Sequence, residues 1–116
     1  MLNQVTLVGR LTDNPEVTET ESGKKVTSVT VAVPRPFKNI NGVYETDFIK
    51  CTLWNKMAMN TSEYCRKGDV VGIKGRLETG HYLDKEENKK YYTNVIVEKV
   101  TFLCSGKKND DEQNVC

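Results

Sequence analysis

The sequence predicts an all-β fold with a single short helix, and three observations support this class. The chain has 116 residues and a mass of 13.2 kDa, which is enough for one domain with its own core. β-Branched residues prevail, with 14 Val, 4 Ile and 12 Thr against 2 Ala and 7 Leu. Apolar and polar residues alternate in short segments that end at Gly, Pro, Asn or Asp. We therefore expect one domain built mainly from strands.

The first two strands are predicted in the N-terminal third of the chain. Residues 3–12 alternate apolar and polar side chains, and Asp13-Asn14-Pro15 then marks a turn. Residues 26–33 place three valines on one face of a second strand. Pro34 and Pro36 follow and remove the backbone donors that a central strand needs, so we expect the second strand to end before them.

A hairpin and a helix are predicted next. Asn41-Gly42 is a strong hairpin signal, since both residues tolerate positive φ, and it leads into a third strand at 47–54. Residues 56–67 carry apolar side chains at three- and four-residue spacing, which predicts a helix of about three turns. Asn55 is the expected N-cap, and the basic residues and glycine at 66–68 suit a helix C-terminus.

Two more strands complete the predicted domain. They cover residues 70–77 and 91–103, and the polar segment 84–90 between them is interpreted as the tip of a long hairpin. Residues 105–116 are polar without periodicity, so we expect a disordered tail after a domain at 1–104. The order of three strands, one helix and two strands matches the five-stranded Greek-key barrel of the oligonucleotide/oligosaccharide-binding (OB) fold.

The third predicted strand carries the sharpest functional signal. Alternation sorts its side chains into two faces, and one face is uniformly apolar: Ile49, Cys51 and Leu53. The opposite face combines two large rings with a cation: Phe48, Lys50, Thr52 and Trp54. Exposed rings beside a cation indicate a binding surface, because nucleobases stack on rings and a phosphate pairs with the cation. The structural alternative is that these rings cover a second core or a subunit interface.

Positive charge gathers in the middle of the chain, although the net charge is only +1. Residues 35–76 hold eight cations and four anions, a local excess of +4 that would attract phosphates. The cations of this segment are Arg35, Lys38, Lys50, Lys56, Arg66, Lys67, Lys74 and Arg76.

Signals for metals, cofactors and catalysis are weak. The four cysteines are separated by 14, 39 and 12 positions and His81 is the only histidine, which argues against a zinc site. The acids are scattered and no nucleophile-elbow, dinucleotide or P-loop motif occurs, so we expect neither an enzyme nor a cofactor. No secretory signal or membrane-spanning run is visible, so we expect a cytoplasmic protein with reduced, mostly structural thiols.

Several motifs together resemble bacterial single-stranded DNA-binding proteins. Each motif is short, but the ordered set spans residues 1–103 and is specific to that family. The motifs are Val5-Thr6-Leu7-Val8-Gly9-Arg10-Leu11-Thr12 with Asp13-Asn14-Pro15-Glu16, Arg35-Pro36-Phe37-Lys38-Asn39, Asp47-Phe48-Ile49 with Trp54-Asn55-Lys56, Tyr64-Cys65-Arg66-Lys67-Gly68, and Val71-Gly72-Ile73-Lys74-Gly75-Arg76-Leu77.

The resemblance implies a homotetramer of OB barrels that binds single strands of any sequence during DNA replication, recombination and repair, in the cytoplasm at the nucleoid. The family's stacking positions fall on four rings of this chain: Phe37, Phe48, Trp54 and Tyr82. The expected phosphate contacts are Arg10, Arg35, Lys38, Lys50, Lys56, Lys74 and Arg76. Phe48 and Trp54 follow from the strand pattern as well, whereas Phe37 and Tyr82 rest on the resemblance.

The C-terminal tail departs from the family pattern. Most replicative members end in a long Gly-, Pro- or Gln-rich linker and an acidic tip closed by an apolar residue, Pro and Phe, which recruits partner enzymes. Here Asp110-Asp111-Glu112 precedes Gln113-Asn114-Val115-Cys116. The chain therefore resembles a short-tailed member, such as a competence-associated, phage or plasmid protein, or a truncated chain, with atypical recruitment of replication and recombination proteins. The alternative reading is a primosomal-type module that chiefly docks proteins and binds oligo-dT weakly.

Overall fold

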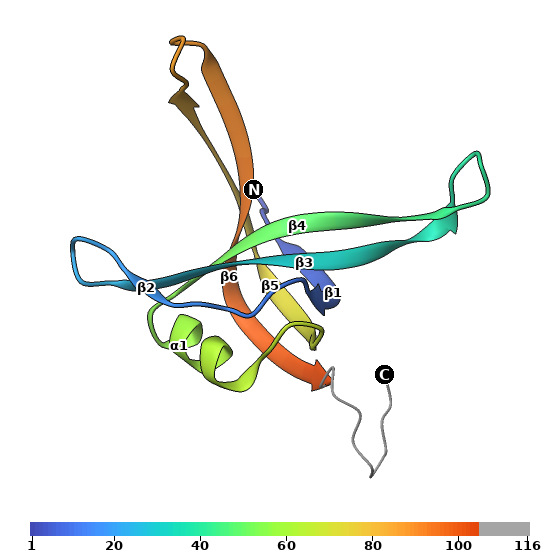
Figure 1. Cartoon of the computed structure of the whole chain (residues 1–116), viewed down its shortest axis with the longest axis horizontal. Coiled ribbons are helices and arrows are strands. Elements are labelled where there is room, and N and C mark those ends of the chain that lie inside the picture. Colours follow the sequence, from blue (N-terminus) through green and yellow to red (C-terminus); the bar gives the residue numbers. More distant parts are fainter. Residues whose placement is uncertain (105–116) are drawn as a thin grey trace.

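Five long strands, one two-residue strand and one helix make up the computed structural model, which describes residues 1–104 apart from the side chain of Cys104 (Figure 1). The elements are β1 (Val5–Leu11), β2 (Thr18–Glu19), β3 (Lys25–Lys38), β4 (Tyr44–Trp54), α1 (Asn55–Tyr64), β5 (Val70–Leu83) and β6 (Lys89–Cys104). The predicted order of five strands with a helix before the last two is confirmed, and β2 is an addition. The predicted tail lies outside the described residues.

The five long strands close into a barrel. The sheet order is β1-β5-β6-β4-β3-β2, and β1 also pairs with β3, which completes the ring. Two of the joins are short, because β1 meets β3 and β4 meets β6 through two residue pairs each, the latter in parallel. The β1–β3 join brings the backbones close together at Gly9, where an added Cβ would collide with the Ala32 carbonyl oxygen. The predicted OB-type barrel is confirmed.

The core of the barrel is aliphatic, and α1 packs against it. Every long strand contributes buried apolar side chains, which are Leu11, Val29, Val31, Cys51, Leu53, Val71, Ile73, Val95 and Val97. From α1, Ala58 and Thr61 are buried. Cys51 and Cys65 are free and buried, and desolvation raises the pKa of the Cys51 thiol to about 11. Both thiols agree with the expected structural role, and Cys116 lies outside the described residues.

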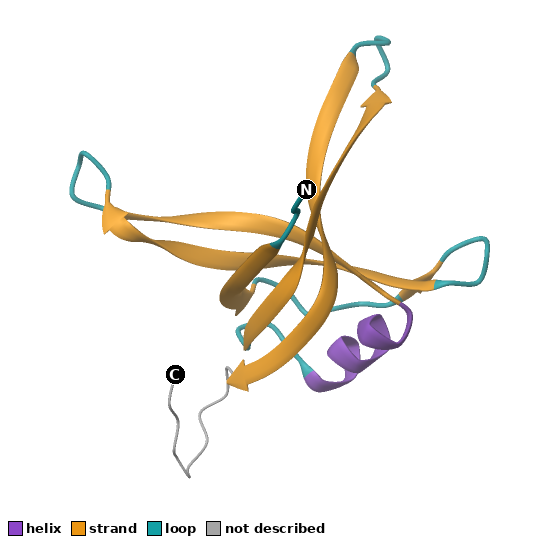
Figure 2. Cartoon of the chain, turned by 180° about the vertical axis from the view of Figure 1, so that it is seen from behind, coloured by secondary structure: helices purple, strands orange, loops and turns teal. Residues whose placement is uncertain are grey.

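The β3–β4 hairpin extends well beyond the barrel as an arm (Figures 1 and 2). The prediction that the strand ends before Pro34 and Pro36 is wrong, because β3 continues through both prolines to Lys38. In the described chain, β1 pairs with β3 only near Ala32, so the arm's outer edge needs no backbone donors. The pairing of β3 with β4 shifts in register between Pro34 and Lys38, so the regular ladder is interrupted at the two prolines.

The loop of this arm and the second arm also differ from prediction in detail. The predicted hairpin at Asn41-Gly42 is present, but only Gly42 has positive φ, at 76°. The Asn39 side chain closes the loop by accepting bonds from the Asn41 and Val43 amides at 2.9 and 3.0 Å. The second arm, β5–β6, is longer than predicted, since pairing continues to Leu83 opposite Lys89.

The helix is shorter than predicted and begins one residue earlier. Trp54 occupies the N-cap position without a side-chain bond, so the expected cap at Asn55 is wrong. Asn55 instead takes a positive φ of 56°, which asparagine tolerates better than most residues at a sharp change of direction. At the other end, the Arg66 guanidinium donates to the Ser62 and Cys65 carbonyls, both at 2.8 Å. Arg66 lies beyond the helix and supplies these carbonyls with the donors that the helix itself lacks at its C-terminus.

Candidate nucleic-acid interface

Every aromatic ring of the chain is exposed. The sequence has three Phe, five Tyr and one Trp, and their exposed fractions run from 36% at Trp54 to 75% at Tyr91. Rings usually supply a large share of a core, because each one buries about 150–250 Å². Here the core is filled by Val, Leu and Ile instead, so the rings are available to an external ligand or partner.

Phe48 lies on the outer face of the barrel in line with a cation. Side chains at directly opposed positions of neighbouring strands point to the same face. Arg10 is opposite Ala32, and Ala32 is opposite Phe48. Arg10 and Phe48 therefore share one face two strands apart, which is about 10 Å. Phe48 is 68% exposed, and the Arg10 Nη1 donates to the Gly68 carbonyl oxygen at 2.9 Å.

A second row of the same face contains Thr52, Ile96 and Arg76. Thr52 is opposite Ile96 across the β4–β6 join, and Ile96 is opposite Arg76. Lys50 and Trp54 flank Thr52 at alternate positions of β4, so they point outward with it. Two rings and three cations point outward in these two rows, and we refer to them as the outer-face cluster: Arg10, Phe48, Lys50, Trp54 and Arg76.

Thr52, at the centre of this cluster, is more covered than the strand pattern predicts. Only 8% of its surface is exposed, because the Asn94 side-chain amide donates to the Thr52 hydroxyl at 2.7 Å. This bond ties β6 to β4 beneath the exposed residues. Of the cluster's cations, Arg76 also pairs with Glu78 at 3.4 Å, whereas no ion pair holds Lys50 within residues 1–104.

The β5–β6 arm extends the outer face with two further rings. Tyr82 follows Arg76 at even spacing along β5, and so points to the same side. Tyr92 is opposite Gly80 and lies close to it, because an added Cβ at Gly80 would run into the Tyr92 ring. The Tyr82 and Tyr92 ring centroids are 6.5 Å apart. Tyr92 was not among the residues predicted from the sequence. Its partner Gly80 alternates with Arg76 and Tyr82 along β5, so the pairing of β5 with β6 could have indicated it.

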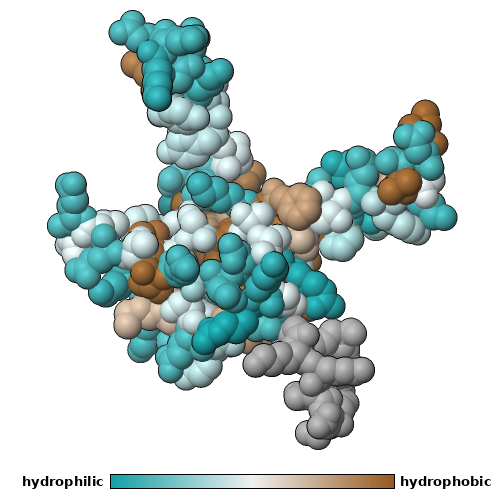
Figure 3. Space-filling model, in the orientation of Figure 1, coloured by the Kyte–Doolittle hydropathy of each residue, from teal (hydrophilic) through white to brown (hydrophobic). Residues whose placement is uncertain are grey.

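The β3–β4 arm carries a third group of rings and cations. Phe37 is 64% exposed. The Lys38 amine lies 5.7 Å from the centroid of the Tyr44 ring. Tyr44 was not among the residues predicted from the sequence. At the tip, Ile40 and Val43 are exposed, and Figure 3 shows apolar surface there at the end of an otherwise polar arm. This arm therefore offers both stacking and apolar contacts.

Arg35 does not join the cluster. Its Nη2 lies 2.9 Å from Oδ1 of Asp47, and its Nη1 lies 3.1 Å from Oε2 of Glu45. The hydrogen bond and charge of Arg35 hold the pKa of Asp47 below its usual value, and Asp47 raises the pKa of Arg35 in turn. Asp47 and Phe48 are consecutive in β4, so Arg35 lies on the side of the arm opposite to Phe48.

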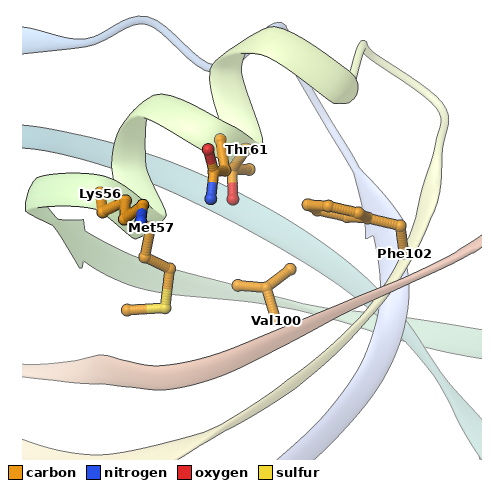
Figure 4. Close-up of a pocket in the computed structure, with 6 residues that line it drawn as sticks. Lys56, Met57, Thr61, Val100 and Phe102 are labelled. Atoms are coloured by element: carbon orange, nitrogen blue, oxygen red, sulfur yellow. The ribbon is translucent and has the colours of Figure 1, made fainter.

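Lys56 and Lys74 lie in two separate hollows. Lys56 lines a pocket of about 330 Å³ between α1 and β6, where Met57 and Val100 face each other and Phe102 stands at one side (Figure 4). Lys74 lines a groove of about 320 Å³ beside Val8 on the outer face of β1, β5 and β6. Neither lysine is placed beside Phe48 or Trp54 by the strand pairing.

The described residues offer neither a metal site nor a membrane-spanning helix. Within residues 1–104 there is no group of three or more His, Cys, Asp or Glu side chains that could hold a metal ion. The helix in that part of the chain is neither long nor apolar enough to cross a membrane.

Known proteins are similar to this chain over most of its length. Single-stranded DNA-binding protein B of Bacillus subtilis (strain 168) is 48% identical over 103 residues, which cover 89% of this chain and 91% of that protein. Single-stranded DNA-binding protein 1 of Staphylococcus aureus (strain Mu50) is 44% identical over 115 residues, 99% of this chain and 74% of that protein. The profile of the Single-strand binding protein family matches residues 2–103. The chain therefore belongs to the Single-strand binding protein family.

Proposed function

We propose that this protein binds single-stranded DNA without sequence preference, with bases stacked on rings and phosphates paired with cations. The observation that carries the proposal is the outer-face cluster, in which Phe48 and Trp54 are exposed on the same sheet face as Arg10, Lys50 and Arg76. Base stacking on an exposed ring contributes about 1–3 kcal/mol and tolerates every base, because each has a flat π face. The relatives' names support the same activity.

The proposed path of the DNA continues from the cluster onto both arms. Tyr82 and Tyr92 extend the outer face along β5 and β6, so successive bases can stack from one element to the next. Phe37 and Lys38 offer a comparable contact on the β3–β4 arm. Because all these groups recognise features common to every nucleotide, the proposed activity is binding and protection rather than catalysis.

Titration of the intrinsic tryptophan fluorescence tests this proposal directly, since the single Trp lies in the cluster. We expect saturable quenching by oligo-dT and by a mixed-sequence single strand, and weak binding of the same mixed sequence as a duplex. The apparent association constant should fall steeply with salt, because cations released from the DNA backbone drive binding. An unquenched tryptophan with no binding by an independent labelled-oligonucleotide assay would contradict the proposal.

We further propose that four copies of the chain assemble into a homotetramer. The support is an exposed apolar strip around the groove on β1, β5 and β6, where Val8 is 54% and Leu103 47% exposed. In the described structure, residues 5–9 of β1 pair with β5 on one edge only, so the other edge can accept a strand. Light scattering should report a tetramer, and Val8→Asp should dissociate it; a monomeric wild-type protein would refute the assembly.

The tetramer has a consequence for one expected phosphate contact. Lys74 lines the groove beside Val8, so an interface there would cover its amine. Under the proposed assembly Lys74 belongs to the interface or its rim, and Lys74→Gln should change assembly more than DNA affinity. The proposed setting is DNA replication, recombination and repair at the nucleoid in the cytoplasm, since this is where single strands arise.

A further inference from the structure

The ladder of backbone hydrogen bonds between β3 and β4 is interrupted at the root of the β3–β4 arm. Pro34 and Pro36 have no N–H groups, and the register with β4 shifts between Pro34 and Lys38. The residue between the two prolines is Arg35. A two-stranded hairpin that lacks backbone hydrogen bonds at its root is free to bend there. The exposed ring of Phe37 follows Arg35 and Pro36 toward the tip of the arm, so bending would move this ring.

Arg35 bridges the two strands where the ladder is interrupted. Its Nε lies 3.1 and 3.2 Å from the two carboxylate oxygens of Asp47, and its Nη2 lies 2.9 Å from one of them. Its Nη1 donates to Glu45 at 3.1 Å. A planar guanidinium that engages two carboxylates in this manner is fixed in direction as well as in position. A lysine could not reproduce the arrangement, because its amine is a single point charge.

The same geometry makes Arg35 a poor phosphate contact. One positive charge faces two negative charges, so these three side chains together carry −1. They also lie on the face of the arm opposite to Phe48, and so on the side away from the outer-face cluster. We propose that Arg35 is a positioning residue, which splints the root of the β3–β4 arm and so fixes the direction of the arm and its rings. This inference rests on the proposed DNA binding only for its functional consequence.

The first experiment tests the splint without DNA. Hydrogen exchange of the arm's backbone amides, such as those of Asn39 and Tyr44, is compared among the wild type, Arg35→Gln and Arg35→Lys. We expect faster exchange in the arm of both variants and unchanged exchange in the barrel core, because exposed bridges affect local order more than global stability. Equal protection of the arm in all three proteins overturns the proposal, whether or not the protein binds DNA.

The second experiment separates positioning from direct contact through the salt dependence of oligo-dT binding. We expect Arg35→Gln to weaken binding by about two- to fivefold at every salt concentration, with the slope of log K against log salt unchanged. Lys50→Gln is the matched control, since it removes one cation on the Phe48 side and should flatten the slope by about 0.7. A similar flattening in Arg35→Gln would mean that Arg35 contacts a phosphate.

The sign of the effect at Asp47 gives an independent check. If Arg35 contacted DNA, the carboxylate would compete with phosphate, and Asp47→Asn would strengthen binding. The splint predicts the opposite: Asp47→Asn weakens binding, and the double variant with Arg35→Gln is no weaker than either single variant, because both changes remove one bridge. Absence of binding in the wild type would refute the proposed function, while the exchange experiment would still decide the splint.

Discussion

Replacing Phe48 with alanine should separate DNA binding from folding. The ring is 68% exposed, so roughly one third of its area is covered by protein. Complete burial of a Phe side chain contributes about 1.5–3 kcal/mol, and the covered third therefore accounts for roughly 0.5–1 kcal/mol of the free energy of unfolding. Loss of one stacked base costs about 1–3 kcal/mol of binding, equivalent to about a 5- to 150-fold weaker affinity.

The assay compares Phe48→Ala with a ring that is equally exposed but lies elsewhere. Tyr64, on α1, is 65% exposed and contacts Phe102 rather than the outer-face cluster. Both variants keep Trp54, so oligo-dT titrations monitored by its fluorescence are directly comparable, and urea unfolding measures the change in stability. We expect both variants to remain folded and only Phe48→Ala to bind weakly. Unchanged affinity in Phe48→Ala, or an equal loss in Tyr64→Ala, would refute the assignment of Phe48 to the binding face.

Four further outcomes follow from the structure. Trp54→Ala should weaken the binding of a labelled oligo-dT by about 1–3 kcal/mol. Because nearly two thirds of the ring is covered, the variant should also lower the free energy of unfolding in urea by roughly 1–2 kcal/mol. The folded-state pKa of Asp47 is lowered, so its ion pair stabilises the protein above the ordinary carboxyl pKa and this stabilisation is lost as the pH falls. Acidification from about pH 5 to about pH 2 should therefore destabilise the wild type more than Asp47→Asn. Parallel curves of stability against pH for the two proteins would contradict the ion pair. Gly9→Ala should cost about 1–3 kcal/mol of stability through the collision at the β1–β3 join, and an unchanged urea midpoint would show that the join can relax. At pH 8, iodoacetamide should leave Cys51 and Cys65 unlabelled until the protein unfolds, because both thiols are buried and the pKa of Cys51 is about 11; rapid labelling of the native protein would contradict that burial.

Local alternation was sufficient to predict which residues of β4 are exposed at the candidate site. Ile49, Cys51 and Leu53 face the core, and Phe48 and Trp54 are exposed, because a strand's two faces can be separated without knowing its neighbours. The helix and the long hairpin follow from comparable local signals, and the barrel was inferred from the order of these elements. The family assignment rests on ordered motifs along the same residues.

Features that depend on pairing between distant strands could not be predicted from local patterns. The alignment of Arg10 with Phe48 passes through Ala32, and this register is fixed only when the barrel closes. The strand was expected to stop at Pro34 because an unpaired edge is invisible in the sequence. Arg35 counted as a free cation for the same reason, since its carboxylate partners lie on the other strand of the arm.

The short β4–β6 join gives the proposed ligand a mechanical role. Only two residue pairs connect these strands, and one of them involves Thr52, directly beneath the cluster. On either side of the join, the molecule consists of two long hairpins that are far better connected internally. A nucleic-acid strand laid from Lys50 and Trp54 on β4 to Arg76 on β5 would cross this junction and clasp the two halves together. Occupancy of the site would thereby suppress opening of the barrel along one of its two narrowest connections.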